Sequence, residues 1–235
     1  MRHKGETRMK KILFYGDSIT YGFDPRGSFG GRYPDTIRWT DQIAQRLCMD
    51  YSIEVDAENG REIPSTPREL NDVSQIIKSY LPFDIFAVML GTNDFLNMYQ
   101  PNIVEVTTRM KKFLETIRSI PEIQSLETLF LLMAPPYIYT AHDDFYAKYD
   151  TTNGIFAKAY RTLASHLGIG FIDTGIWKVE PAYDGIHLSE KGNLIFADRM
   201  EETLISYMIE SNVKKNIRQE LKDGISGALY FGFYE

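Results

Sequence analysis

Five apolar segments recur along the chain, and in each the apolar residues are continuous rather than alternating with polar ones. This pattern is typical of parallel strands that helices cover on both faces. The segments are Lys11–Tyr15, Tyr51–Ala57, Asp84–Leu90, Thr128–Ala134 and Gly170–Ile172. We therefore expect a sheet of five parallel strands.

Helical spacing of apolar residues marks the segments between these strands. The clearest stripe contains Ile103, Val106, Met110, Phe113, Leu114 and Ile117, and Asn102 stands before it as a candidate N-cap. Further helices are expected at Thr36–Leu47, Thr66–Tyr80, Asp143–Leu167 and Ser189–Met208. Because parallel neighbours need crossover connections that pack on the sheet, this alternation predicts a doubly wound, three-layer α/β/α sandwich.

A length of 235 residues suits one large α/β domain. We expect a polar leader over residues 1–9, the domain over 10–211 and a C-terminal tail over 212–235. The leader is polar and basic and lacks the apolar core of a secretory signal, so a cytoplasmic location is expected. The longest apolar run, Ile85–Leu90, is far shorter than the ~20 residues that span a bilayer, so no membrane span is expected.

Charge and cysteine content narrow the classes of function. The formal net charge of −6 argues against a nucleic-acid partner, because no basic stripe is present to neutralise phosphates. Cys48 is the only cysteine, which excludes an internal disulfide and a thiolate cluster for zinc or iron–sulfur chemistry. We expect Cys48 to be a small apolar residue packed on a helix.

Ser18 follows the first apolar run, in the sequence Gly16-Asp17-Ser18-Ile19. A hydroxyl on the turn that leaves a buried strand lies at the carboxyl edge of the sheet, where open α/β sheets bind small ligands. Ser18 is therefore a candidate nucleophile. Its hydroxyl attacks poorly at neutral pH unless a neighbouring base takes its proton.

Four histidines could supply this base, and His187 has the most informative surroundings. Asp184 stands three residues before it with a glycine between them, whereas His3, His142 and His166 lack such a partner. In a tight turn of this kind the carboxylate can hold one tautomer of the imidazole and stabilise its charged form.

Alternatives to this pair stay open at the level of sequence. His187 could be a polar residue at the start of a helix. Asp94 and Asp173 follow other strands and could replace Asp184 as the acid, although neither has the same local spacing.

Candidate donors for an oxyanion follow the second and third strands. Asn59-Gly60 ends the second strand, and a glycine lets a backbone N–H approach a ligand closely. Gly91-Thr92-Asn93-Asp94 ends the third strand and offers the side-chain amide of Asn93. Both sequences are also good turn formers wherever a strand stops.

Two long loops, Phe23–Asp35 and Pro135–Asp144, follow strands or their first turns and are candidate pocket walls. In the second loop, Tyr137, Tyr139 and His142 either line an acyl or leaving-group pocket or cover the sheet edge.

Taken together, four blocks resemble, in order, those of the SGNH hydrolases, also called GDSL esterases or lipases. They are Gly16-Asp17-Ser18-Ile19, Asn59-Gly60, Gly91-Thr92-Asn93-Asp94 and Asp184-Gly185-Ile186-His187. Ile19 stands where the family usually has leucine, a small departure that should not affect the chemistry. The resemblance extends from about Lys10 to Asp198 and implies the flavodoxin-like topology of that family.

The resemblance implies a role for each matching residue. Ser18 would be the nucleophile, His187 the base and Asp184 the acid that orients it. The backbone N–H groups of Ser18 and Gly60 and the amide of Asn93 would form the oxyanion hole. No metal or organic cofactor is expected, because the serine itself carries the covalent intermediate.

The segments Arg32-Tyr33-Pro34, Ile37–Thr40 and Met89–Asp94 look most like the arylesterase and acyltransferase branch. We therefore predict a serine esterase that hydrolyses short-chain acyl esters of small molecules and can pass the acyl group to alcohols. Carbohydrate acetylesterase, lysophospholipase and thioesterase activities would use the same site. Enzymes of this branch tend to form oligomers, and both a homo-oligomer and a monomer fit the composition.

A hypothesis of a different class is a non-catalytic, flavodoxin-like module. In it, Gly16-Asp17-Ser18 would hold a phosphate at the first turn. This hypothesis leaves Asp184 and His187 unexplained.

Overall fold

Five parallel strands form one sheet in the order β2-β1-β3-β4-β5. The computed structural model describes residues 8–27, 31–140 and 146–209. The strands are β1 (Lys10–Gly16), β2 (Tyr51–Ala57), β3 (Ile85–Met89), β4 (Leu129–Ala134) and β5 (Gly170–Asp173). In this order the chain winds first to one side of β1 and then to the other, as the sequence predicts.

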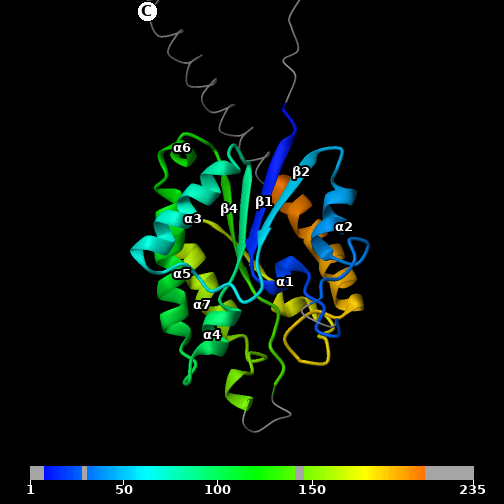
Figure 1. Ribbon diagram of the computed structural model, residues 1–235. Coiled ribbons are helices and arrows are strands. Elements are labelled where there is room, and N and C mark those ends of the chain that lie inside the picture. The colour runs from blue at the N-terminus through cyan, green and yellow to red at the C-terminus, as the bar shows by residue number, and fades with distance from the viewer. Residues whose placement is uncertain (1–7, 28–30, 141–145, 210–235) are drawn as a thin grey trace, which may run out of the picture. The chain divides into compact units, whose positions relative to one another are not determined.

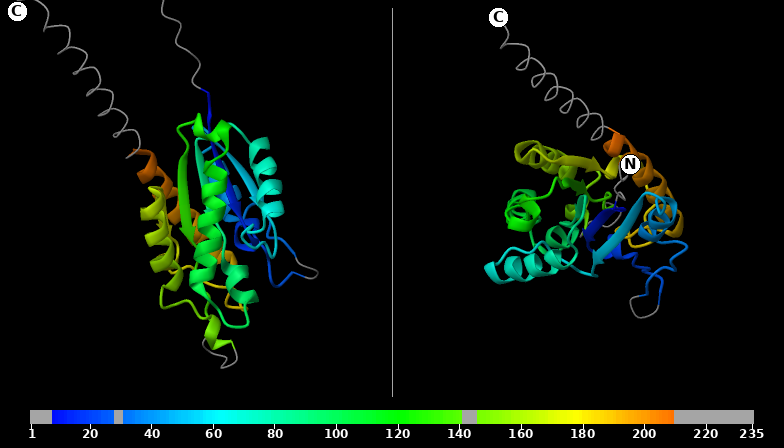
Figure 2. Two further views of the ribbon diagram at one scale, coloured as in Figure 1. Left: turned by 90° about the vertical axis from the view of Figure 1, so that its left-hand side faces the viewer. Right: turned by 90° about the horizontal axis from the view of Figure 1, so that it is seen from above.

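Helices cover both faces of this sheet, so the expected three-layer sandwich is confirmed (Figures 1 and 2). One face carries α3 (Pro67–Ser79), α5 (Ile103–Arg118) and α7 (Ile155–Leu167). The other carries α2 (Trp39–Arg46) and the first part of a helix over residues 190–209. Shorter elements are α1 (Ser18–Tyr21), α4 (Thr92–Asn97), α6 (Pro121–Gln124) and two 3₁₀ turns, η1 (Ala147–Tyr149) and η2 (Gly175–Trp177).

Alternating residues of β1 point into two apolar layers. Leu13 belongs to the large core cluster under α3, α5 and α7. Phe14 lies on the other side, with its ring centroid 5.0 Å from that of Trp39, which is in turn 4.7 Å from Phe196. Trp39 is fully buried and is therefore a core residue. Burial on both faces fixes β1 rigidly, and its carboxyl end carries the candidate nucleophile.

Helix starts follow the local sequence. Thr66 and Glu69 form a reciprocal capping box at the start of α3, where Pro67 is the first helical residue. Asn102 caps α5 as expected, because its side chain accepts from the N–H groups of Val104 and Glu105.

Two expectations from the sequence are wrong. The helix expected from Asp143 begins only at Ile155, because Gly154 takes a left-handed conformation (φ +73°) directly before it. Cys48 is exposed rather than packed, because α2 ends at Arg46 before the chain reaches it.

The chain divides into two compact units, residues 1–197 and 198–235. In the second unit the described residues, 198–209, continue the helix that begins at residue 190. The expected tail from residue 212, the leader before residue 8 and His142 lie outside the described residues. Among the helices in the described ranges, none has the length and apolar character needed to cross a membrane.

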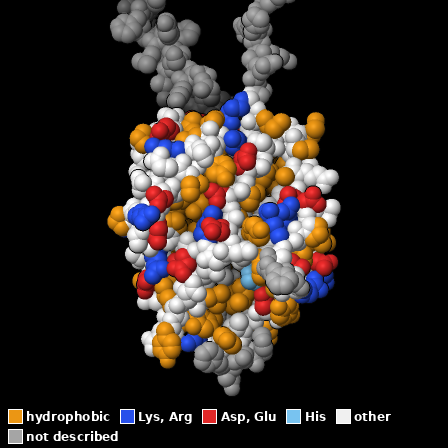
Figure 3. All heavy atoms as spheres, in the orientation of Figure 1, with side chains coloured by type: hydrophobic (Ala, Val, Ile, Leu, Met, Phe, Trp, Pro, Cys, Tyr) orange, Lys and Arg blue, Asp and Glu red, His pale blue; other side chains and the backbone are white. Residues whose placement is uncertain are grey.

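Acidic and basic side chains are interspersed over the face seen in Figure 3, with apolar groups between them. No large area of a single charge sign is visible on this face.

Candidate active site

The candidate residues come from segments that leave the same edge of the sheet. Ser18 follows β1, Gly60 follows β2 and Asn93 follows β3, whereas Asp184 and His187 come after β5. In a parallel sheet all carboxyl ends meet at one edge, which is the lower edge in Figure 1, where α1 and α4 lie. The topology therefore brings distant parts of the chain together.

Ser18 is the first residue of the short helix α1. Asp17 caps this helix, because its Oδ1 accepts from the N–H of Ile19 at 3.0 Å. The helix ends after a single turn at Gly22, which has a left-handed backbone (φ +81°). Ser18 is only 7% exposed, so the groups packed around it restrict the positions that its hydroxyl can take at the edge of the sheet.

Ser18, His187 and Asp184 form a chain of hydrogen bonds. The Nε2 atom of His187 lies 2.9 Å from the Ser18 Oγ, and the Nδ1 atom lies 2.6 Å from Oδ2 of Asp184. An ionised carboxylate can only accept, so Nδ1 of the neutral ring carries the hydrogen. Nε2 is then free to accept the hydrogen of the Ser18 hydroxyl.

The carboxylate of Asp184 is anchored within its own turn. Oδ1 accepts from the backbone N–H groups of Ile186 and His187, each at 3.0 Å. Burial raises the pKa of Asp184, but hydrogen bonds from the His187 ring and from these two N–H groups outweigh it and hold the pKa below its usual range. Asp184 is therefore ionised at neutral pH.

Contacts from the loop after α1 hold the imidazole in place. The ring of Phe23 lies against that of His187, with 4.6 Å between centroids. The hydroxyl of Tyr183 donates to the carbonyl of Pro25 at 2.8 Å, which joins this loop to the turn that carries His187.

The other side of the turn depends on Gly185. Its backbone is left-handed (φ +70°), and its carbonyl accepts from the N–H of Tyr139 at 2.8 Å. A Cβ at this position would lie 2.2 Å from the carbonyl oxygen of Tyr139. Glycine is therefore required for both the conformation and the space. Tyr139 itself is half exposed, whereas the ring of Tyr137 packs against Gly175.

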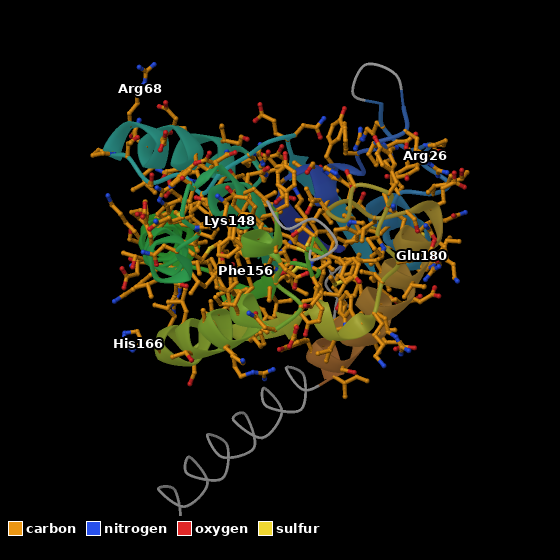
Figure 4. All side chains as sticks on the ribbon, turned by 90° about the horizontal axis from the view of Figure 1, so that it is seen from below. Arg26, Arg68, Lys148, Phe156, His166 and Glu180 are labelled. Atoms are coloured by element: carbon orange, nitrogen blue, oxygen red, sulfur yellow. The ribbon has the colours of Figure 1, made fainter. Side chains whose placement is uncertain are left out.

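Ion pairs lie beside this turn. Figure 4, seen from below, shows Arg26 and Glu180 on the same side of the molecule. Arg26 pairs with Glu190 at 2.9 Å, and Glu180 pairs with Lys191 at 3.4 Å. These contacts are largely exposed and contribute little to stability individually.

Gly60 and Asn93 lie on neighbouring segments that contact each other. Gly60 is left-handed (φ +75°), and a Cβ there would meet no heavy atom within 4 Å. The Nδ2 of Asn93 donates to the carbonyl of Arg61 at 3.0 Å. Among the hydrogen bonds of the described residues, the N–H of Gly60 has no protein acceptor.

Gly91 fixes the start of α4 and hence the position of Asn93. It has φ +116°, and a Cβ there would lie 2.4 Å from the hydroxyl oxygen of Tyr160. That hydroxyl donates to the carbonyl of Leu90 at 2.9 Å. The ring of Phe156 on α7, labelled in Figure 4, also packs 5.4 Å from that of Phe95 on α4.

The other two candidate acids have different partners. Asp94 is buried and accepts from the N–H of Ile63 at 3.0 Å and from Arg109 at 3.3 Å. Asp173 accepts from the N–H of Gly175 at 3.2 Å. In the described part of the chain neither has a hydrogen bond to His187, whereas Asp184 does.

Asp17 is a buried carboxyl group beside the candidate nucleophile. Burial raises its pKa to about 6, against the opposing influence of the Ile19 N–H and of His187. Its second oxygen, Oδ2, has no hydrogen-bond partner among the described residues. The group therefore changes charge in the same pH range in which an ordinary histidine does.

Phe23 and Arg61 were not among the candidate site residues predicted from the sequence. Phe23 contacts the imidazole, and Arg61 follows Gly60 and accepts the hydrogen bond of Asn93. The position of Arg61 beside Gly60 was the one available signal in the sequence.

Within the described ranges, no group of three His, Cys, Asp or Glu side chains is arranged to hold a metal ion.

Comparisons with known proteins identify the family of the chain. The sequence profile of the GDSL-like lipase/acylhydrolase family matches residues 14–195, a range that contains Ser18, Gly60, Asn93, Asp184 and His187. The chain belongs to this family, whose fold and blocks are those of the SGNH hydrolases, and it is a hydrolase of carboxylic esters.

Solved structures show the same fold at low sequence identity. A carbohydrate acetylesterase from Sinorhizobium meliloti and an aryl esterase from M. smegmatis are each 24% identical, with a TM-score of 0.71. Each alignment covers 84% of this chain and 99% of the other. A putative arylesterase from Agrobacterium tumefaciens is 22% identical, with a TM-score of 0.70 and the same coverage. No curated protein is similar enough in sequence to count as a match.

Proposed function

We propose that the protein is a serine esterase that cleaves short-chain acyl esters through an acyl-enzyme on Ser18. The observation that carries this proposal is the hydrogen-bonded chain from Ser18 through His187 to Asp184, at 2.9 and 2.6 Å. The three side chains have the donor and acceptor order that nucleophilic catalysis by a serine requires.

In the first step, Nε2 of His187 takes the proton of the Ser18 hydroxyl while Oγ bonds to the ester carbonyl carbon. The electron pair of the carbonyl bond moves to oxygen and gives a tetrahedral oxyanion. When the oxyanion collapses, the bond to the alcohol oxygen breaks, and His187 returns its proton to that oxygen. Asp184 stabilises the imidazolium between these events.

In the second step, water reacts with the acyl-enzyme, and the events of the first step occur in reverse order. His187 takes a proton from water, whose oxygen attacks the acyl carbon, and the proton returns to Ser18 Oγ as the acid leaves. An alcohol in place of water would receive the acyl group by the same route. Hydrolysis and acyl transfer therefore need the same residues and differ in which nucleophile reaches the acyl-enzyme.

Three donors are proposed for the oxyanion hole: the N–H groups of Ser18 and Gly60 and the side-chain amide of Asn93. The Gly60 N–H supports this role, because it has no acceptor among the hydrogen bonds of the described residues and can donate to an oxyanion. Donors fixed before the reaction stabilise the developing charge more than they stabilise the neutral carbonyl.

Short acyl esters of aryl alcohols or of sugars are the proposed substrates. Support comes from the structurally similar aryl esterase of M. smegmatis and carbohydrate acetylesterase of Sinorhizobium meliloti. Relative rates on aryl acetate, acetylated xylan, lysophospholipid and acyl-CoA would define the class.

A fluorophosphonate probe and a nitrophenyl ester test the proposal directly. The probe should label one peptide, which contains Ser18, and Ser18→Ala should abolish labelling and lower kcat for p-nitrophenyl acetate by about 10⁴ or more. A matched control is Ser189→Ala, since Ser189 lies close in sequence to His187 but bonds to Glu180. Turnover by Ser18→Ala near the native rate would refute the proposal.

A further inference from the structure

Arg61 connects the segments that carry all three proposed oxyanion donors. It directly follows Gly60, in the loop between β2 and α3. Its side chain is only 14% exposed, which is unusual for an arginine in a turn. The question is what this buried guanidinium does.

The guanidinium lies across the carboxyl ends of β1 and β2. Its Nη1 donates to the carbonyls of Gly16 at 3.1 Å and Asp56 at 2.8 Å, and its Nη2 lies 2.7 Å from Oδ1 of Asp56. The guanidinium carbon is also 4.4 Å from the ring centroid of Tyr15. Gly16 stands two residues before Ser18, so one end of this network reaches the nucleophile's own turn.

The backbone of Arg61 makes the remaining connections. Its carbonyl accepts from Nδ2 of Asn93 at 3.0 Å, and its N–H donates to the carbonyl of Glu58 at 3.3 Å. Gly60 lies between Glu58 and Arg61, which the second of these bonds joins. A hydrogen bond from Arg61 therefore closes the short turn around Gly60, and the carbonyl of Arg61 joins this turn to Asn93.

We propose that Arg61 is a positioning residue of the oxyanion hole: its side chain fixes the Gly60 N–H and the Asn93 amide relative to Ser18. The inference rests on the proposed function of these donors. Gly60 has no side chain to pack, so contacts made by neighbouring residues have to restrict its left-handed backbone.

Displacement of an oxyanion donor should destabilise the transition state more than the bound substrate. A donor that moves by a fraction of an ångström loses more interaction with the concentrated charge of the oxyanion than with the neutral substrate carbonyl. Loss of the Arg61 side-chain contacts should therefore lower kcat with little change in KM. The forked guanidinium reaches the carbonyls of two strands and a carboxylate together, whereas the single ammonium of lysine cannot match this geometry.

The experiment compares Arg61→Ala and Arg61→Lys with Arg118→Ala in the full chain. Arg118 is a matched control, because it donates to the carbonyl of Leu167 at 2.8 Å and lies 5.8 Å from the ring centroid of Phe130, at the end of α5. The measurements are kcat and KM for p-nitrophenyl acetate and the midpoint of thermal unfolding.

Removal of one oxyanion donor costs about 10²–10³ in kcat, so displaced donors should cost about 10–100-fold. We expect this loss in Arg61→Ala with KM within about threefold of native, a smaller loss in Arg61→Lys, and native kcat in Arg118→Ala. Native kcat in Arg61→Ala, a loss that appears only in KM, or an equal loss in Arg118→Ala would overturn the inference.

Should Arg61→Ala fail to fold, Arg61→Lys decides: a reduced kcat at unchanged KM supports the inference, and native kcat overturns it.

The Ser18→Ala variant separates this inference from the proposed function. If Ser18→Ala is inactive while Arg61 variants are native, the positioning role alone is wrong. If Ser18→Ala is active, the proposed function, on which the positioning role rests, is wrong.

Discussion

His187 has one partner on each side of its ring, and the charge of the Asp184 carboxylate decides which ring nitrogen carries the hydrogen. This carboxylate is held by two backbone N–H groups as well as by the ring. Its position is therefore fixed independently of the protonation state of His187. A change of its charge alone should reveal its role without moving the turn.

Asp184→Asn should lower kcat by about 10³–10⁴, because an amide can donate to Nδ1 and stabilise the wrong tautomer of His187. The matched control is Asp173→Asn, at a carboxylate that also caps a backbone N–H after β5 but does not bond to His187. Steady-state kinetics on p-nitrophenyl acetate measure both variants. A fall of less than tenfold in Asp184→Asn, or an equal fall in the control, would show that the acid is elsewhere.

Asp17 should make stability depend on pH. Its folded pKa of about 6 lies above the unfolded value of ~3.9, so the folded state holds the extra proton between these limits. The contribution of Asp17 to the free energy of unfolding therefore falls as pH rises through this range. Above pH 6 the folded protein carries the full cost of a buried charge.

Asp17→Asn removes this titration. Between pH 5 and pH 8, the unfolding free energy of the variant should rise relative to that of the native protein by about 1 kcal/mol, since one pKa unit corresponds to ~1.4 kcal/mol. Urea unfolding at both pH values measures this difference. The exposed Asp72→Asn is the control, and a pH-independent difference for Asp17→Asn would contradict the burial argument.

At the scale of elements, the turn from Ala182 to Leu188 is a small closed unit. The N–H of Ala182 donates to the carbonyl of His187 at 2.7 Å, and Pro181 pairs with Leu188 in an antiparallel bridge. Gly185 lies at the point where this unit touches Tyr139. The alignment of the proposed base therefore depends on a glycine that is not itself one of the proposed catalytic groups.

Gly185→Ala should lower both stability and kcat, the latter by at least about tenfold, because its Cβ would collide with the Tyr139 carbonyl. Gly168→Ala is the control: Gly168 has φ +64°, but a Cβ there meets no heavy atom within 4 Å. It should lose only the ~1–2 kcal/mol of left-handed strain and keep native kcat. Thermal unfolding and kinetics compare the pair, and equal kcat values would show that the turn tolerates displacement.

The strands were predicted to within about a residue, because each is a continuous apolar run that helices bury on both faces. The short helices α1, α4 and α6 were not predicted, since elements of four to six residues are too short to show a helical period. The start of α7 was placed too early, because periodicity does not show that Gly154 adopts a left-handed conformation.

The candidate site, too, could be predicted only in part from local sequence patterns. Asp184 and His187 could be paired from local spacing, but the contact between Ser18 and His187 joins residues 169 positions apart. It was expected only because both residues follow strands and match known blocks. Arg61 could not be predicted as buried, because arginine in a turn is usually solvated and its partners lie on two other segments.

At the scale of the whole chain, the family match ends at residue 195, and every proposed site residue precedes it. The predicted domain boundary near residue 211, the tail and a homo-oligomer stay predictions. A chain that ends at residue 211 tests them together.

This shortened chain should keep kcat for p-nitrophenyl acetate within about twofold of the full chain, because no proposed catalytic group is removed. Kinetics and the mass in solution should be measured on both. A loss of more than tenfold, or activity that disappears together with an oligomer, would show that residues 212–235 support the site.

One turn supplies the proposed acid and the proposed base, and the carboxylate accepts from the very residue whose ring it orients. Their mutual geometry is thus determined within one turn of the chain. Among the three side chains of the proposed triad, only one long-distance alignment, between that turn and the serine, has to be achieved by folding. Mutations that shift the turn as a rigid body should therefore separate the nucleophile from an acid–base pair that is itself still intact.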